Sequence, residues 1–124
     1  MGVLRTTVAL VALSVLPFGV ATGQPLSPLV VDWDRYFVVQ PQPGAREGRA
    51  IVTVRNTSNW NAGRIQLLVE ALDSGGQPTD QRVVWLGSDL PAGTHAEIDV
   101  PTSPAASHRV RVFAFILDLA AGPR

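Results

Sequence analysis

Hydrophobic and polar residues alternate along most of the chain after residue 23, which is the pattern of half-buried β-strands. The alternation is clearest where Ala96, Ile98 and Val100 share one face and polar residues occupy the other. The same pattern predicts six strands in all, over Leu29–Gln40, Arg49–Asn56, Arg64–Leu72, Arg82–Leu86, Thr94–Val100 and His108–Leu117.

Stretches rich in Gly, Pro, Asn and Ser separate these six segments. Such stretches end strands, because Gly and Asn tolerate positive φ and Pro removes a hydrogen-bond donor. The gaps are too short for the helix that a parallel crossover needs, which excludes parallel α/β folds. Strands at intervals of roughly ten residues therefore predict an immunoglobulin-like antiparallel β-sandwich of six to seven strands.

The first 23 residues have a different pattern. Arg5 lies in a short polar lead, an apolar run of thirteen residues follows over Val8–Val20, and Ala21–Gly23 supplies small residues. This order is typical of a secretory signal peptide, and the run is shorter than the about 20 residues of a membrane-spanning helix. We expect cleavage after Gly23, with an uncleaved anchor as the alternative, so that residues 24–124 form one extracytoplasmic domain, periplasmic or secreted.

Composition narrows the possible functions. The chain of 124 residues has ten basic and ten acidic residues and no cysteine, and every basic residue is arginine. The balanced charge argues against nucleic-acid binding, which usually relies on a basic face. Without cysteine, the chain has no disulfide, no acylated cysteine as a lipid anchor and no thiolate for a blue-copper site. The fold must therefore be stabilised by packing alone.

The third and the last predicted strands carry apolar residues on both faces. Leu68, Phe113 and Phe115 lie on the second face, and a large apolar surface of this kind usually marks an interface. Alternatively, the amino-terminal strand or the tail Leu119–Arg124 covers these residues, or both faces of a central strand belong to the core. We take Leu68, Phe113 and Phe115 as candidate contacts for an envelope protein or a glycan.

Trp60 lies in the polar loop between the second and third predicted strands. An exposed tryptophan is a frequent binding anchor, although a loop tryptophan also closes the open end of many sandwiches. We include Trp60 among the candidate contacts with that alternative open. Asn56-Thr57-Ser58 fits the N-glycosylation pattern, but we interpret Asn56 as a turn former at the end of a strand.

No constellation for catalysis is present, since the chain has neither a nucleophile elbow nor a Gly-rich oxyanion loop. We therefore predict a non-enzymatic protein without a cofactor or a resident metal. A second class of function is a metal- or small-ligand-carrying protein that uses Asp32, Asp34 and Asp118, because calcium prefers carboxylate oxygens. A third is a structural subunit that adds Leu29–Gln40 to the sheet edge of a neighbour.

Three segments carry a family pattern, namely Val54-Arg55-Asn56, Val69-Glu70-Ala71-Leu72-Asp73 followed by Gly75-Gly76, and Leu90-Pro91-Ala92-Gly93 leading to Ile98-Asp99-Val100. Over residues 50–116 the chain resembles the FxLYD family of bacterial and archaeal immunoglobulin-like extracytoplasmic modules. Val69, Ala71 and Leu72 stand in place of the Phe, Leu and Tyr of the family motif, and Asp73 is kept.

Departures from the family pattern include Ile98 in place of a later Phe and Val52 in place of a frequent Gly. The bacterial cell-adhesion-related CARDB modules look similar over Asn56–Ser58 and Leu90–Gly93. Both resemblances imply a sandwich fold and an interaction associated with the cell envelope. Neither implies a catalytic residue.

Overall fold

The part of the chain that the structure describes forms two antiparallel sheets of three strands each. The computed structural model describes residues 24–44 and 46–119, so the predicted signal peptide lies outside the described residues. The strands are β1 (Phe37–Pro43), β2 (Arg49–Asn56), β3 (Ala62–Leu72), β4 (Pro78–Trp85), β5 (His95–Pro101) and β6 (Ser107–Leu117), preceded by a 3-10 turn, η2 (Trp33–Arg35). Their order is β1-β2-β5 in one sheet and β4-β3-β6 in the other.

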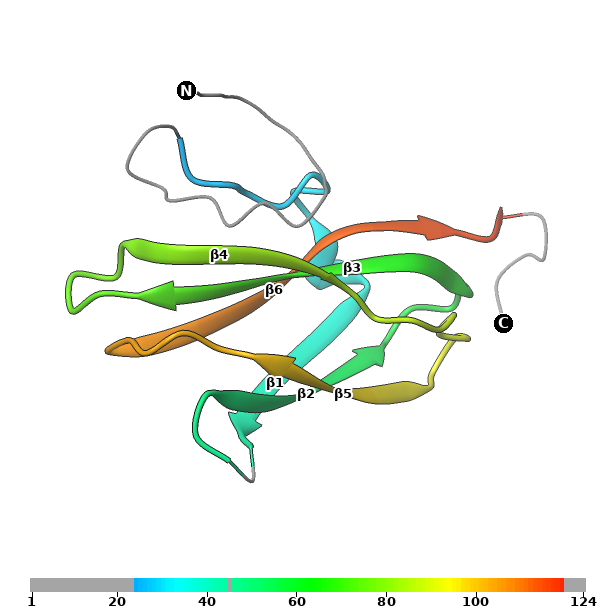
Figure 1. Ribbon diagram of the computed structural model, residues 1–124. Helices are drawn as coiled ribbons and strands as arrows, with labels where there is room; N and C mark the ends of the chain where they lie inside the picture. The colour runs from blue at the N-terminus through cyan, green and yellow to red at the C-terminus, as the bar shows by residue number, and fades with distance from the viewer. Residues whose placement is uncertain (1–23, 45, 120–124) are drawn as a thin grey trace.

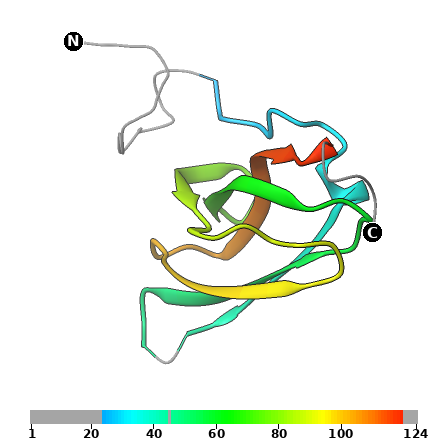
Figure 2. The ribbon, with the colours of Figure 1, turned by 90° about the vertical axis from the view of Figure 1, so that its right-hand side faces the viewer.

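The two sheets pack face to face, and the core lies between them (Figures 1 and 2). Val52 and Val54 on β2 face Leu67 on β3 and Val112 on β6, and none of these side chains has exposed surface. Phe37 adds an edge-to-face contact with Phe115, with ring centroids 4.8 Å apart, that joins β1 to β6. The alternation that predicts the strands also supplies this core, and the all-β sandwich is confirmed.

The first strand is shorter at its start than the sequence predicts. The prediction of a strand over Leu29–Gln40 is wrong before Phe37, because Trp33–Arg35 forms a 3-10 turn. The Arg35 amide donates to the Asp32 carbonyl at 3.0 Å, and the two side chains form an ion pair at 3.5 Å. Asp is a turn former, and a pair three residues apart is satisfied by a turn and not by a strand. Val31, within the predicted strand, is exposed.

At its other end, β1 continues through Pro41 and Pro43, which the sequence pattern assigns to a turn. β1 lies at the edge of its sheet and pairs only with β2. A proline is tolerated at an edge because the missing N–H would face solvent on the unpaired side. The tight turn comes later, where Gly48 adopts φ +80°, a conformation that favours glycine.

A change of register in β6 reverses which of its residues face the core. The pairing runs from Val112 opposite Leu67 directly to Ala114 opposite Gln66, so Phe113 is an extra residue in β6. Beyond this bulge, Phe115 and Leu117 pack on the core and Ile116 is exposed. An unbroken alternation over the predicted strand His108–Leu117 would place Ala114 and Ile116 on the core face of Val112, and the bulge shows that this alternation is broken.

Asn56, the last residue of β2, is completely buried and organises the following loop. Its Nδ2 donates to the carbonyls of Trp60 and Leu90 at 2.7 and 2.9 Å, and its Oδ1 accepts from the Ser58 amide at 2.9 Å. This is an Asx turn, as expected for a turn former. Since the amide nitrogen is enclosed and bonded, it is inaccessible to a glycosylating enzyme in the folded chain.

Candidate functional site: the outer face of the β4-β3-β6 sheet

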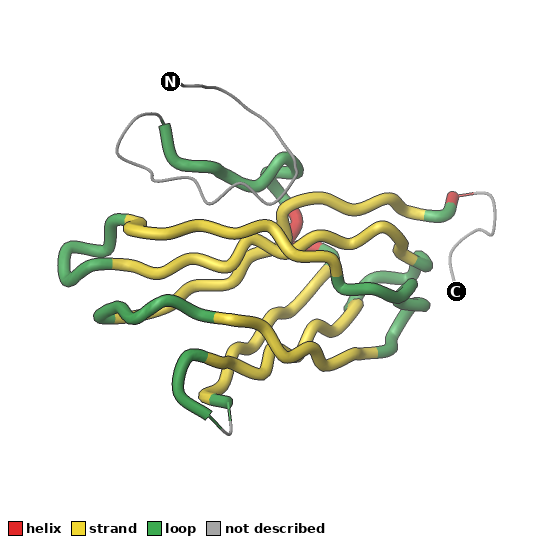
Figure 3. Tube along the Cα trace, viewed as in Figure 1, coloured by secondary structure: helices red, strands yellow, loops and turns green. Residues whose placement is uncertain are grey.

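The β4-β3-β6 sheet has one face on the core and an outer face that points away from β1-β2-β5. Residues 24–32, which we call the strap, run over this outer face without regular secondary structure before they reach η2 (Figures 1 and 3). The Leu26 main chain bonds to the side chain of Gln81 on β4, and the Leu29 amide donates to the Phe113 carbonyl on β6 at 2.8 Å. The strap therefore crosses the sheet from one edge strand to the other.

Beneath the strap, side chains that would otherwise meet water are buried. Leu68 and Glu70 on β3 have no exposed surface, and Gln81, opposite Glu70 on β4, is only 1% exposed. All three lie on the outer face, because Leu67 and Val69 face the core and strand residues alternate. The strap, together with the apolar stems of two arginines on β6, encloses them.

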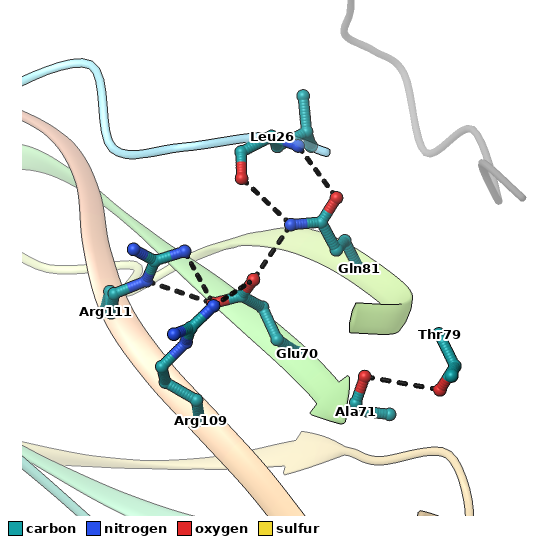
Figure 4. Close-up of polar contacts among 7 residues, drawn as sticks. All are labelled: Leu26, Glu70, Ala71, Thr79, Gln81, Arg109 and Arg111. Carbon is teal, nitrogen blue, oxygen red and sulfur yellow. Dashed lines mark hydrogen bonds and ion pairs between the residues drawn. The ribbon is translucent and has the colours of Figure 1, made fainter. Parts of the chain in front are cut away.

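Four side chains form a polar cluster here that we call the clamp: Glu70, Gln81, Arg109 and Arg111 (Figure 4). Arg109 donates to both carboxylate oxygens of Glu70, at 2.8 Å from Nε and 3.1 Å from Nη2. Arg111 adds contacts to Oε1 at 3.0 Å from Nε and 2.9 Å from Nη2. Two cations thus satisfy a completely buried carboxylate, and Arg109 binds it in a bidentate geometry.

Gln81 connects this carboxylate to the strap. Its Nε2 donates to Glu70 Oε2 at 2.9 Å and to the Leu26 carbonyl at 2.9 Å, while its Oε1 accepts from the Leu26 amide at 2.8 Å. Because an ionised carboxylate only accepts hydrogen bonds, Glu70 fixes which end of the amide carries nitrogen. The side chain of Gln81 then binds one residue of extended chain through its N–H and C=O, as a neighbouring strand would.

The charged groups of the clamp stabilise each other in their ionised forms. Burial alone would raise the pKa of Glu70, but the hydrogen bonds from Arg109 and Gln81 and the charges of Arg111 and Arg109 hold that pKa below its ordinary value of 4.5. The pKa of Arg109 is in turn raised by its hydrogen bond to Glu70. Glu70 is therefore an ionised anchor and not a general acid, which would need a raised pKa.

This pKa shift predicts a pH dependence of stability. Since the pKa of Glu70 is lowered on folding, its contribution is complete above 4.5 and is lost as the pH falls through the lowered value. We expect the difference in unfolding free energy between wild type and Glu70→Gln to be constant near neutral pH and to shrink in acid. Urea unfolding of both proteins over this range measures it, and a difference that grows in acid would contradict the assignment.

Beyond the strap, the outer face has an uncovered apolar surface formed by Trp85 on β4 and Ile116 on β6, which we call the apolar end. Trp85 on β4 is 57% exposed and Ile116 on β6 is 56% exposed. Trp85 lies opposite Gln66 and Gln66 lies opposite Ala114, while Ile116 lies two residues after Ala114 on β6, opposite Gly63. On the strap, Leu29 and Val31 are 69% and 89% exposed. Of the six large apolar residues that are exposed in the described part of the chain, these make four.

The structure separates the contact residues expected from the sequence. Leu68 is completely enclosed under the strap, and Phe115 packs on the core against Tyr36 and Phe37. Phe113 is partly buried at the bulge, where its carbonyl accepts from the strap. Trp60 is partly buried in its loop. Cover by the amino-terminal part of the chain, one of the alternatives for the second apolar face, therefore accounts for Leu68.

Sequence reasoning did not identify the clamp, although a signal for it exists. Glu70 lies between Leu68 and Leu72 on the same face of a strand that is apolar on both faces. A lone acid in that position needs a cation on a neighbouring strand, and Arg109 and Arg111, two residues apart, form a pair that shares one face. The pairing of β3 with β6 places Arg109 opposite Glu70.

Other candidate sites on the described surface have less support than the outer face of the β4-β3-β6 sheet. A shallow hollow beside the β1–β2 hairpin is lined by Arg49 and His108 among others, but Arg49 is paired with Asp99 at 2.9 Å and the His108 ring lies 2.6 Å from the Ser103 carbonyl. No group of three His, Cys, Asp or Glu residues that could hold a metal ion occurs in residues 24–44 and 46–119. The structure thus lends no support to a metal site that includes Asp32, Asp34 and Asp118.

Comparison with protein-family models, with curated proteins and with solved structures finds no match to this chain. Within the described residues, no helix is long and apolar enough to cross a membrane. The candidate site therefore rests on its own geometry: a buried clamp that binds main chain, and an uncovered apolar end beside it.

Proposed function

We propose that this protein is a non-enzymatic interaction module that works outside the cytoplasm and contacts a partner protein of the cell envelope through the apolar end. The observation that carries the proposal is the exposure of Trp85 and Ile116 on one sheet face. Tryptophan is enriched among the residues that dominate binding energies, and most of the exposed apolar side chains gather on this side. An exported setting is supported by the signal-peptide pattern of residues 1–23 and by the resemblance to FxLYD and CARDB modules.

The geometry also favours a rigid contact surface. Trp85 lies on β4 and Ile116 lies on β6. The strand between these two, β3, is anchored by the core on one face and by the clamp on the other. Side chains on a fixed scaffold lose little freedom on binding, which lowers the cost of association. Gln66, which lies opposite Trp85, supplies a polar group beside it that can orient a partner.

The test uses the double variant Trp85→Ser plus Ile116→Ser. Because both side chains are more than half exposed, we expect it to stay folded, with a change in unfolding free energy of about 0.5 kcal/mol per site or less. Chemical cross-linking in the envelope of the producing cell should lose the partner that wild type captures. The matched control is Val38→Ser, an exposed apolar residue on the opposite sheet, which should capture the same partner as wild type. Equal capture by all three proteins would refute the proposal.

A further inference from the structure

The clamp recognises the strap by main-chain atoms. Gln81 bonds to the N–H and C=O of Leu26, and the second attachment joins the Leu29 amide to the Phe113 carbonyl. Each non-proline residue carries these two groups, so the polar contacts identify an extended segment and not a particular side chain. Pro25 precedes the bonded residue and Pro28 follows two residues later, and each proline fixes its own φ, which reduces the number of conformations open to the free strap.

An empty groove over the clamp would be unfavourable. Gln81 would lose both bonds to Leu26, and the apolar side chain of Leu68 would face water, whereas Glu70 would keep its bonds to Arg109, Arg111 and Gln81. A polar group that stays enclosed without a partner is unfavourable. An extended segment in the groove is therefore favoured, and the polar contacts do not require that this segment belong to the same chain.

We propose that the groove over the clamp also accepts residues 24–32 of a second copy of the chain, so that two copies exchange their straps and form a dimer. The exchanged segment makes the same contacts as the strap of the single chain, which is why exchange requires few new interactions. This proposal does not depend on the apolar end, since the groove and the partner surface are different parts of the outer face.

The connection between the strap and the sandwich suits such an exchange. Its turn is held by short-range bonds, from the Trp33 amide to the Val30 carbonyl at 3.3 Å and from the Tyr36 amide to the Trp33 carbonyl at 3.0 Å. The Asp32–Arg35 ion pair beside it is exposed and contributes little. Trp33 and Tyr36 pack on the core and keep their places, so the exchange opens the chain ahead of Trp33, at the bond from the Trp33 amide to the Val30 carbonyl.

The exposure of Val31, in the segment that connects the strap to the sandwich, is an independent indication that the straps exchange. Val31 is 89% exposed in the single chain, the highest value among the exposed large apolar residues of the described ranges. In an exchanged dimer, the two connections pass each other between the copies, so Val31 and its counterpart come to lie at the new contact between them. A residue that is almost fully exposed in the monomer thereby gains apolar contacts in the dimer.

The absence of cysteine makes the exchange directly testable. Two single variants are made, Ser27→Cys on the strap and Val83→Cys on β4, whose position lies next to Gln81 on the outer face. They are unfolded together in urea, refolded at high protein concentration and treated with a flexible bismaleimide. Exchange places the thiol at position 27 of one copy over the thiol at position 83 of the other. We therefore expect a covalent dimer that is several-fold more abundant than in either variant alone and that declines on dilution before cross-linking.

The control replaces Val83→Cys with Glu97→Cys on the opposite sheet, which exchange does not bring near the strap. Thr79→Cys on β4 serves in place of Val83→Cys if that variant fails to fold. A covalent dimer no more abundant than in the control mixture, with an internal cross-link in the double variant Ser27→Cys plus Val83→Cys, would overturn the proposal. That result would leave the apolar end untouched, because Trp85→Ser plus Ile116→Ser tests it separately.

Discussion

Replacement of Arg109 and Arg111 together by Met is expected to lower the free energy of unfolding by about 3–5 kcal/mol at neutral pH. Methionine keeps much of the apolar stem of each arginine but removes both cations from Glu70, whose side chain has no exposed surface. An uncompensated buried carboxylate must then either remain charged or take up a proton, and both are costly. Chemical unfolding in urea measures the effect.

Two matched variants distinguish this cause from general damage. Adding Glu70→Gln to the double variant removes the unpaired charge, and we expect most of the lost stability to return. Arg49→Met breaks the ion pair with Asp99, whose side chains are 35% and 51% exposed, and should cost no more than about 1 kcal/mol. The interpretation fails if Arg49→Met is as harmful as the double variant, or if Glu70→Gln restores nothing.

Phe37→Ala is expected to cost about 3–5 kcal/mol, because it opens a cavity where β1 and β6 meet. Phe37 is 1% exposed and packs edge to face on Phe115. The chain has no disulfide to compensate for the lost packing, so we expect a large fall in the thermal midpoint as well.

The neighbouring residue is the control for this substitution. Val38 points the other way on β1 and is 44% exposed, so Val38→Ala should change the unfolding free energy by about 0.5 kcal/mol or less. Similar losses for Phe37→Ala and Val38→Ala would mean that β1 does not present alternate residues to the core, contrary to the structure.

The sandwich can be predicted from the sequence because each strand has one face in the core. Val52 and Val54 on β2, and Leu67 and Val69 on β3, alternate with residues that leave the core, and this period of two depends only on local chain geometry. Turn-forming residues bound the strands, and Asp73 illustrates how: its Oδ1 accepts from the amides of Gly75 and Gln77, both at 2.9 Å, and closes the β3–β4 hairpin.

Features that depend on the pairing of segments distant in the sequence cannot be predicted from this alternation. The bulge at Phe113 arises from how β6 matches β3, and no local pattern in either strand marks it. One inserted residue reverses the faces of Phe115 and Ile116 and so exchanges a core residue for an exposed one. A second shift of register follows between Gly63 and Gln66, where Arg64 adopts φ +51°. The burial of Glu70 likewise depends on a strap whose extended conformation carries no periodic signal.

The clamp changes how the outer face is understood. From sequence alone, Leu68 is a candidate contact residue, with cover by another segment as an alternative. In the structure both Leu68 and Glu70 are buried under the strap. What remains uncovered is smaller and lies further along the sheet, at Trp85 and Ile116. The proposed contact surface therefore rests on these two residues, and Leu68 and Phe115 instead serve to hold the strap and the core.

Amide hydrogen exchange at Leu26 and Leu29 tests most directly whether the strap is held on the outer face through its main chain. Both amides donate hydrogen bonds, to Gln81 Oε1 and to the Phe113 carbonyl, each at 2.8 Å. We predict slow exchange at both positions in wild type, and faster exchange at Leu26 in Gln81→Leu, which removes its acceptor. Exchange of both amides in wild type as fast as in an unstructured peptide of the same sequence would contradict the account.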